Sequence, residues 1–331
     1  MPSLIFILGG KELNTYYFSG SLTASMHDYL VAMPDFKPLD ILISQLDKSA
    51  IRQMIKWKHE GFCRTLFIDS GAFSIHTGKA HVTVDEYIDY INSIDDDIDV
   101  FAQLDTIPGK LGQPKSPQDY AESAKKSWEN YLYMRSRVKS PNKLMPVYHQ
   151  GEDVSALKNM LEWTDESGKH LEYVGLSPAN DITVNVRNIY LNNMNDVIKA
   201  SSNPNVKTHL YGYTSLEGLS KIACYSADSI SHRHIAAYNK ILSKHFGVIS
   251  ITKRPRTSTT KSNLSFVALA DEYNLKILND EIAECGMTLE LLQEDSSARV
   301  AFTMHTIQNL ISDKYAFDDK KQKRSRKLFN L

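Results

Sequence analysis

Short apolar runs alternate with segments of helical periodicity along most of the chain. The runs have the length of strands and lie at residues 40–44, 65–69, 100–105, 144–149, 173–177, 207–213, 226–230 and 247–251. A further apolar run at 4–8 precedes them. Strands that alternate with helices are typical of an α/β fold with a parallel sheet. The spacing therefore predicts a (β/α)8 TIM-like barrel, with a doubly wound sheet as the alternative.

The segments between these runs carry the signals of helix starts. Thr83 is followed three residues later by Glu86, which is the pattern of a capping box. Ser116 precedes Pro117, as expected for an N-cap followed by proline at the first helical position. These signals agree with the alternation of strands and helices.

The pattern changes after residue 252. A basic segment rich in serine and threonine leads into helical periodicity at 264–283 and 288–311, and the chain ends on a run of lysine and arginine. We therefore expect a barrel domain over 1–252, a linker and helical appendage over 253–319, and a basic tail over 320–331.

Composition and charge exclude few classes of protein. The formal net charge is −1, and 42% hydrophobic with 23% charged residues is ordinary for a soluble globular protein. The cysteines Cys63, Cys224 and Cys285 match neither a disulfide nor a zinc spacing. The apolar start of the chain is too short for a membrane span and lacks the basic residues of a signal peptide. We expect a cytoplasmic protein without a membrane partner.

Three of the predicted strands end on an aspartate: Asp69, Asp105 and Asp228. A single aspartate at such a position is often a helix N-cap. The carboxyl ends of the strands face the active site in parallel α/β folds, however, so three aspartates together predict a site.

Two chemistries fit these carboxylates. In the first, one carboxylate is a nucleophile at a glycosidic carbon and another is the acid and base. In the second, aspartates and histidines hold a divalent metal that activates water. The His-x-His and paired-cysteine signatures usual for such a metal site are absent, apart from His232 and His234 at an expected helix entrance. The sequence therefore favours glycosyl chemistry without a metal.

Six motifs, taken in order, resemble those of the tRNA-guanine transglycosylase superfamily. They are Asp69-Ser70-Gly71-Ala72-Phe73-Ser74, Leu104-Asp105, Tyr148-His149-Gln150-Gly151, Val174-Gly175-Leu176-Ser177, Tyr211-Gly212 and Ser226-Ala227-Asp228-Ser229. The last motif is closest to the DpdA-type 7-deazaguanine DNA transglycosylases of phages and bacteria. The chain lacks the Cys-x-Cys-x-x-Cys zinc motif of the tRNA-modifying enzymes. The resemblance therefore implies base exchange on DNA without a structural zinc or other cofactor.

The resemblance also implies a role for each motif. Asp228 would attack C1′ of a target guanosine, and Asp69 would transfer the proton of the leaving and incoming bases. The base would be bound by Phe73, Asp105, Gln150, Gly175, Leu176, Tyr211 and Gly212. Phe73 and Tyr211 would stack on the ring. Helix capping by Gln150 and core packing of Phe73 and Tyr211 are the alternatives.

The partners implied are DNA and a free 7-deazaguanine base such as preQ0, in the host cytoplasm if the protein is phage-encoded. The target guanosine would have to leave the duplex to reach a barrel mouth. Contacts to the DNA backbone are expected from His232, Arg233, Lys253, Arg254 and Arg256. The competing interpretations are the same exchange on tRNA, a metal-dependent barrel hydrolase, and a non-catalytic nucleic-acid-binding barrel.

Overall fold

The computed structural model describes residues 13–328, apart from residues 111, 180, 181, 214, 220 and 253–270, and no side chains from 313 onward. The chain divides into two compact units. The barrel unit comprises Met1–Ser21 and Leu39–Ser229, and the C-terminal unit comprises Leu22–Pro38 and Ile230–Leu331.

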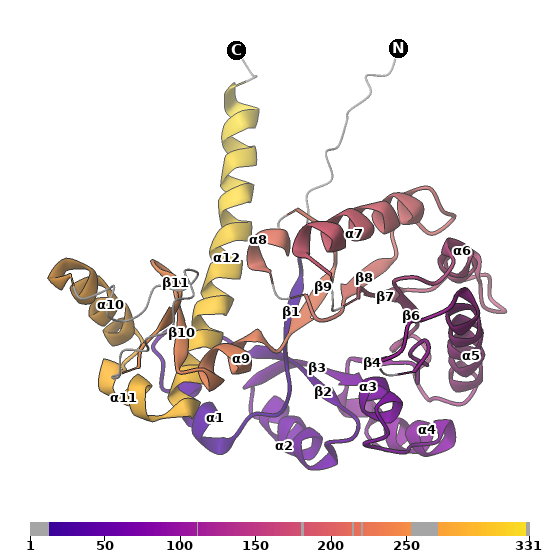
Figure 1. The fold of residues 1–331 in the computed structure, drawn as a ribbon, viewed down its shortest axis with the longest axis horizontal. Helices are drawn as coiled ribbons and strands as arrows, with labels where there is room; N and C mark the ends of the chain where they lie inside the picture. The colour runs from indigo at the N-terminus through magenta and orange to yellow at the C-terminus, as the bar shows by residue number, and fades with distance from the viewer. Residues whose placement is uncertain are drawn as a thin grey trace. The chain divides into compact units, whose positions relative to one another are not determined.

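Nine parallel strands form one sheet in the barrel unit (Figure 1). They are β1 (Thr15–Ser19), β2 (Leu39–Ser44), β3 (Cys63–Asp69), β4 (Val100–Ala102), β5 (Leu144–Met145), β6 (Val147–His149), β7 (Tyr173–Ser177), β8 (Lys207–Leu210) and β9 (Ser226–Ser229). The order in the sheet is β5-β4-β3-β2-β1-β9-β8-β7-β6. Since β5 and β6 follow each other directly on either side of Pro146, together they take the place of one barrel strand, which pairs with both β4 and β7. The fold is therefore the expected TIM-like barrel.

Helices follow most strands of this unit. They are α2 (Lys48–His59), α3 (Ala72–His76), α4 (Val84–Ser93), η1 (Asp95–Asp97), α5 (Pro117–Arg135), α6 (Val154–Glu162), α7 (Val184–Lys199) and α8 (Leu216–Leu219). The structure confirms the capping box at Thr83 and Glu86 before α4. It also confirms the N-cap at Ser116, where Asp119 completes a second capping box before α5.

The barrel interior is a packed core. One buried cluster takes an inward-facing side chain from each of seven strands: Tyr17, Leu42, Phe67, Ala102, Met145, Val147 and Tyr173. Because successive side chains of a strand point to opposite faces, the alternate residues face the helices. The core fills the barrel below the strand ends and leaves the carboxyl-terminal ends to build a site.

The prediction was wrong about two strands. The apolar pattern did not identify β1, which is the barrel strand that pairs with both β2 and β9. The run at 247–251 instead contributes β11 (Gly247–Ser250), which pairs antiparallel with β10 (Lys240–Ser243) in the C-terminal unit. In this hairpin the backbone groups of β11 form hydrogen bonds with β10, so β11 needs no partner in the barrel. The run at 4–8 lies outside the described residues.

The C-terminal unit is built around α12 (Ser296–Leu328). Its other helices are α1 (Ala24–Val31), α9 (Ser231–Ala237), α10 (Glu272–Glu284) and α11 (Leu289–Glu294). The first turns of α12 are buried, and the Arg299 guanidinium donates to the carbonyls of Ala236 and Leu292. Residues 22–38, which we assigned to the barrel domain, pack in this unit.

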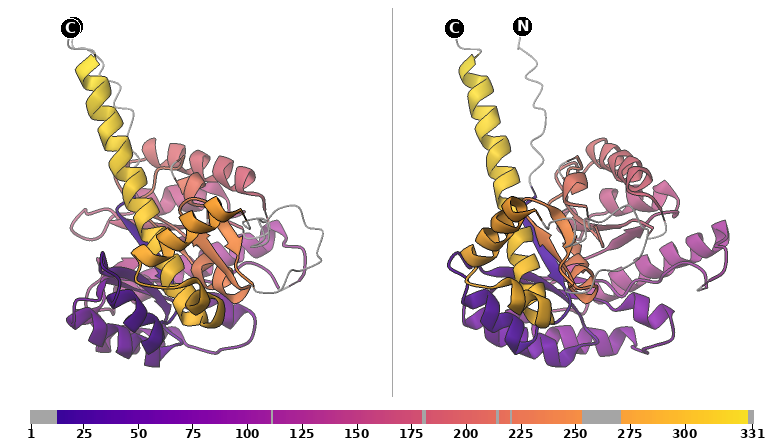
Figure 2. Two further views of the ribbon diagram at one scale, coloured as in Figure 1. Left: turned by 90° about the vertical axis from the view of Figure 1, so that its left-hand side faces the viewer. Right: turned by 60° about the vertical axis from the view of Figure 1, so that its left-hand side comes forward.

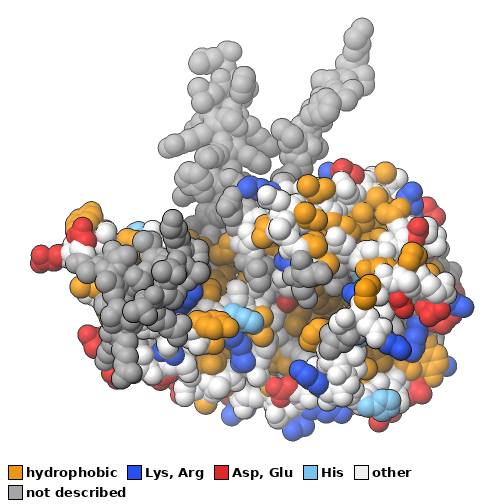
Figure 3. Space-filling model, viewed as in Figure 1, with side chains coloured by type: hydrophobic (Ala, Val, Ile, Leu, Met, Phe, Trp, Pro, Cys, Tyr) orange, Lys and Arg blue, Asp and Glu red, His pale blue; other side chains and the backbone are white. Residues whose placement is uncertain are grey.

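The helical appendage is thus present, and α12 continues as one helix into the basic tail (Figure 2). Among the described helices, none is long and apolar enough to cross a membrane. Basic and acidic side chains are interspersed on the face drawn in Figure 3.

Candidate active site

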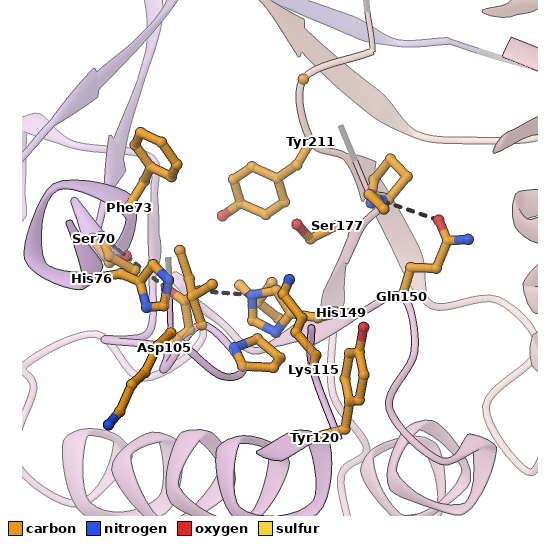
Figure 4. A pocket seen from close by; sticks show the side chains of 18 of the residues that line it. Ser70, Phe73, His76, Asp105, Lys115, Tyr120, His149, Gln150, Ser177 and Tyr211 are labelled. Carbon is orange, nitrogen blue, oxygen red and sulfur yellow. Dashed lines mark hydrogen bonds and ion pairs between the residues drawn. The ribbon is translucent and has the colours of Figure 1, made fainter. Parts of the chain in front are cut away.

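A cavity of about 730 Å³ lies at the carboxyl-terminal ends of the barrel strands. Figure 4 shows side chains from several strand ends and loops pointing into it. Among the residues that line it are Asp69, Phe73, Asp105, His149, Gln150, Tyr211 and Gly212. The barrel therefore brings together residues that are separated by more than a hundred positions in the sequence.

Asp69 ends β3 and occupies a tight turn into α3. Gly71 has φ +74° and donates its N–H to Asp69 Oδ2 at 3.0 Å. A Cβ on Gly71 would lie 2.9 Å from side-chain atoms of Leu46 and Ser44, so glycine fits this turn for both reasons. Burial raises the pKa of Asp69 to about 7, and the charges of Asp105 and Asp228 act in the same direction. Asp69 can therefore both donate and accept a proton near neutral pH.

Asp105 is part of a buried chain of hydrogen bonds. Ser70 Oγ donates to Asp105 Oδ1 at 2.7 Å, and His149 Nε2 lies 2.9 Å from Oδ2. On its other side, His149 Nδ1 lies 3.1 Å from Glu152 Oε1. Burial lowers the pKa of His149, but the hydrogen bonds to Asp105 and Glu152 outweigh this effect and raise it to about 9. At neutral pH a protonated imidazole therefore lies between the side chains of Asp105 and Glu152.

Asp228, in β9, accepts hydrogen bonds on both of its carboxylate oxygens. Ser19 Oγ donates to Oδ2 at 2.5 Å, and the Gly212 N–H donates to Oδ1 at 2.8 Å. His209 Nε2 lies 3.2 Å from the same Oδ1. Behind it, His209 Nδ1 lies 2.7 Å from Ser226 Oγ. These contacts fix the orientation of a carboxylate that is only 7% exposed.

The two aromatic residues expected to hold a base take different positions. Phe73, on α3, is 61% exposed and lines the cavity, so it does not belong to the core. Tyr211 packs edge-on against His209 with ring centroids 4.6 Å apart. Burial, together with nearby carboxylates, raises the pKa of Tyr211 well above its ordinary value, so its hydroxyl stays protonated. Figure 4 shows this hydroxyl pointing into the cavity, and it has no hydrogen-bond partner among the described residues.

Of the other residues expected to contact the base, some line the cavity and some do not. The Gln150 side-chain carbonyl accepts from the Ala179 N–H at 3.0 Å, and both residues line the cavity. Gly175 and Leu176 are not among its lining residues. The Gly175 N–H donates to the Pro146 carbonyl, and the Leu176 carbonyl accepts from the Tyr211 N–H, so these groups are used within the barrel.

Gly175 instead makes room for Tyr211. A Cβ at this position would lie 2.7 Å from the Tyr211 ring, which is closer than such atoms approach in proteins. The backbone of β7 and the ring therefore lie in contact only because residue 175 is glycine.

None of the residues expected to contact the nucleic-acid backbone belongs to the described part of the barrel unit. His232 and Arg233 lie in α9 of the C-terminal unit. The His232 ring is completely buried, which disfavours a phosphate contact, and Arg233 is half-buried. Lys253, Arg254 and Arg256 lie outside the described residues, and their role stays a prediction.

Sequence reasoning did not identify three residues that support the site: two of them contact Asp228, and the third contacts His149. Ser19 ends β1, whose run of aromatic residues Tyr16, Tyr17 and Phe18 was the available strand signal. His209, in β8, contacts Asp228 through its Nε2. Glu152 carried no signal, because a polar residue after Gly151 is ordinary for a loop.

The described residues contain no group of three or more His, Cys, Asp and Glu side chains that could hold a metal ion. In comparisons with known proteins, no family model matches the chain and no curated protein matches it. Function is therefore inferred from the motifs and from the geometry of the site.

Proposed function

We propose that this protein replaces guanine in DNA with a free 7-deazaguanine base, through a covalent glycosyl intermediate on Asp228. The observation that carries the proposal is that the three strand-end aspartates have three different environments. Asp228 is held on both oxygens, Asp105 is bonded to a protonated histidine, and Asp69 has a pKa raised to about 7 by burial. Carboxyl groups in contrasting environments divide the roles of nucleophile, binder and acid/base.

The exchange needs two displacements at one carbon. An oxygen of Asp228 forms a bond to C1′ while the C1′–N9 bond breaks, and the electron pair leaves with guanine. Protonated Asp69 supplies the proton that the leaving base takes up. Ionised Asp69 then takes the N9 proton of the 7-deazaguanine, whose nitrogen attacks C1′ and releases Asp228. The two inversions give retention, and no oxidant or reductant is needed.

The cavity has the volume of a site for one extruded nucleotide, and Gly212, which donates to Asp228, lines it although Asp228 itself does not. Its volume of about 730 Å³ lies within the usual range of ligand sites. Phe73, exposed at the cavity, offers a ring face to a base, and such a stack contributes about 1–3 kcal/mol. Lys110 and Lys115 also line the cavity and supply positive charge for backbone phosphates.

Nucleoside mass spectrometry tests the proposal. The protein would be incubated with 7-cyano-7-deazaguanine and, separately, with duplex DNA, single-stranded DNA or tRNA, and the digested nucleosides would be analysed. We expect a 7-deazaguanine deoxynucleoside from DNA, and none with Asp228→Ala or Asp69→Asn. Asp89→Asn, at an exposed position on α4, is the matched control and should keep full activity.

The outcomes separate the competing functions. Incorporation into tRNA alone would keep the chemistry and replace the substrate. A product that forms equally well with Asp228→Ala would reject the covalent mechanism. No product from any nucleic acid, with the protein folded and supplied with several 7-deazaguanines, would reject base exchange.

A further inference from the structure

Glu152 is a buried acid behind the candidate site. Its side chain has no exposed area, and Oε2 has no hydrogen-bond partner among the described residues. Its Oε1 lies 3.1 Å from His149 Nδ1, and its backbone carbonyl accepts from the Tyr148 hydroxyl at 2.9 Å. A buried carboxylate is costly unless it is compensated, and the one ion pair of Glu152 in the described part of the chain is with His149. Glu152 therefore acts on the site through the imidazole.

The hydrogen bonds of the His149 ring fix the position of the Asp105 carboxyl group. When both ring nitrogens carry protons, Nδ1–H donates to Glu152 and Nε2–H donates to Asp105 Oδ2. Ser70 donates to the other oxygen of Asp105. Asp105 lines the cavity, so the lone pairs that remain on its two oxygens are the acceptors it offers to a ligand.

We propose that Glu152 and His149 are positioning residues that hold the oxygens of Asp105 in place as acceptors, so that the cavity selects bases with two adjacent N–H donors. The 2-amino-6-oxopurines and their 7-deaza analogues present such an edge, with N1–H beside the 2-amino group. A base without the 2-amino group would leave one of these remaining lone pairs without a donor in the closed site, and a buried acceptor that lacks its donor disfavours binding. This inference rests on the proposed function, since it specifies the base which that site accepts.

The surrounding charges explain why Asp105 needs this support. Asp69, at the end of β3, interacts electrostatically with Asp105 and has an elevated pKa. The charged groups that face His149 are Asp105, which follows β4, and Glu152, which follows β6. Without the imidazolium, Asp105 Oδ2 would lose the donor that orients it, and its oxygens would no longer be held in one position towards a ligand. The cavity would then accept 6-oxopurines with or without a 2-amino group.

The first test measures base selectivity by equilibrium binding to the full chain. The probes are 7-deazaguanine and 7-deazahypoxanthine, which differ only in the 2-amino group. We expect the native protein to prefer 7-deazaguanine by about 100-fold, and Glu152→Gln to lower this ratio about tenfold, as expected for a lost charge-assisted interaction. Glu152→Leu, which also removes the acceptor, should bring the ratio close to one. Glu162→Gln, exposed at the end of α6, is the matched control.

The second test observes the imidazole directly. In protein labelled with ¹⁵N-histidine, the His149 nitrogens should show a doubly protonated ring at pH 7.5, with the signals assigned by their loss in His149→Gln. The ring should lose a proton at lower pH in Glu152→Leu than in the native protein. A purely structural role for Glu152 would change stability without changing the base ratio or the charge of this ring.

The two readouts separate the inference from the proposed function. Unchanged selectivity and an unchanged imidazole in folded Glu152→Leu would overturn the inference, whether or not base exchange occurs. Selectivity that depends on Glu152, without base exchange on any nucleic acid, would support the inference and refute the proposed function. Failure of the native protein to bind either base would overturn the ligand class along with the function.

Discussion

Replacing Asp69 with asparagine should make the barrel unit more resistant to unfolding at pH 8 than at pH 5, relative to the native protein. The pKa of Asp69 rises from 3.8 to about 7 on folding, chiefly because the carboxyl is buried and secondarily because of Asp105 and Asp228. Above pH 4 the unfolded chain loses this proton while the folded protein keeps it. The folded state is therefore increasingly penalised until the pH passes 7, and above that the penalty is constant.

The magnitude follows from the size of the shift. About three pKa units at 1.36 kcal/mol each give an upper limit of about 4 kcal/mol. The Asp69 side chain is partly open to the cavity, where water screens the charge, so we expect about half of this limit. Between pH 5 and pH 8 the difference in unfolding free energy between Asp69→Asn and native protein should grow by about 1–2 kcal/mol. The Gly71 N–H can still donate to the asparagine oxygen, so the turn is retained.

Urea unfolding at the two pH values, followed by tryptophan fluorescence, provides the measurement. The protein has three tryptophans, and Trp57, Trp128 and Trp163 all lie in the barrel unit, so fluorescence reports on that unit. Asp89→Asn controls for the loss of a charge at an exposed site. If the stability difference between Asp69→Asn and the native protein were the same at pH 5 and pH 8, the elevated pKa would be wrong, and with it the assignment of Asp69 as acid and base.

Three further substitutions test separate parts of the structure. Gly175→Ala should push the Tyr211 ring out of place, costing about 1–3 kcal/mol of unfolding free energy and weakening base binding; unchanged affinity would show that Tyr211 does not contact the base. Thr83→Ala should cost about 1 kcal/mol through the lost cap of α4 and leave base exchange intact, as urea unfolding and the nucleoside assay would show. Arg64→Gln should remove the guanidinium that donates to Asp40, a residue only 6% exposed near the start of β2. Because Arg64 is itself 56% exposed, we expect a cost of about 1–2 kcal/mol in urea unfolding, and no loss would indicate that water replaces the guanidinium.

The strand ends that carry the site could be predicted because their signals are local. An apolar run that stops at a polar residue marks both a strand and its end, and this located Asp69 at the end of β3, Asp228 next to the last residue of β9 and Asp105 in the loop after β4. The run at 247–251 misled the same reasoning. Its residues favour a strand, but strand propensity does not specify the partner, and the nearest partner was β10.

The surroundings of the residues expected to bind a base were harder to predict. Gly175 was expected to present backbone groups to the base, whereas the structure uses its N–H in the barrel and its missing side chain to admit Tyr211. Phe73 had core packing as an alternative, and only the position of α3 at the cavity shows it to be exposed. Such distinctions depend on which atoms lie opposite a residue, and this is a property of the assembled barrel.

The sequence by itself determined the alternation of strands and helices, and placed three aspartates where parallel strands end. These features follow from hydrophobic periodicity and capping, which act over a few residues. Only the tertiary structure decided what each carboxylate contacts: Ser19 and Asp228 lie 209 positions apart, and His149 and Asp105 lie 44 apart. Burial and the charges of neighbours govern the pKa of a carboxyl group, and both arise only when the barrel closes. The same residue type therefore has three different environments, and with them three different proposed roles, according to its place in the fold.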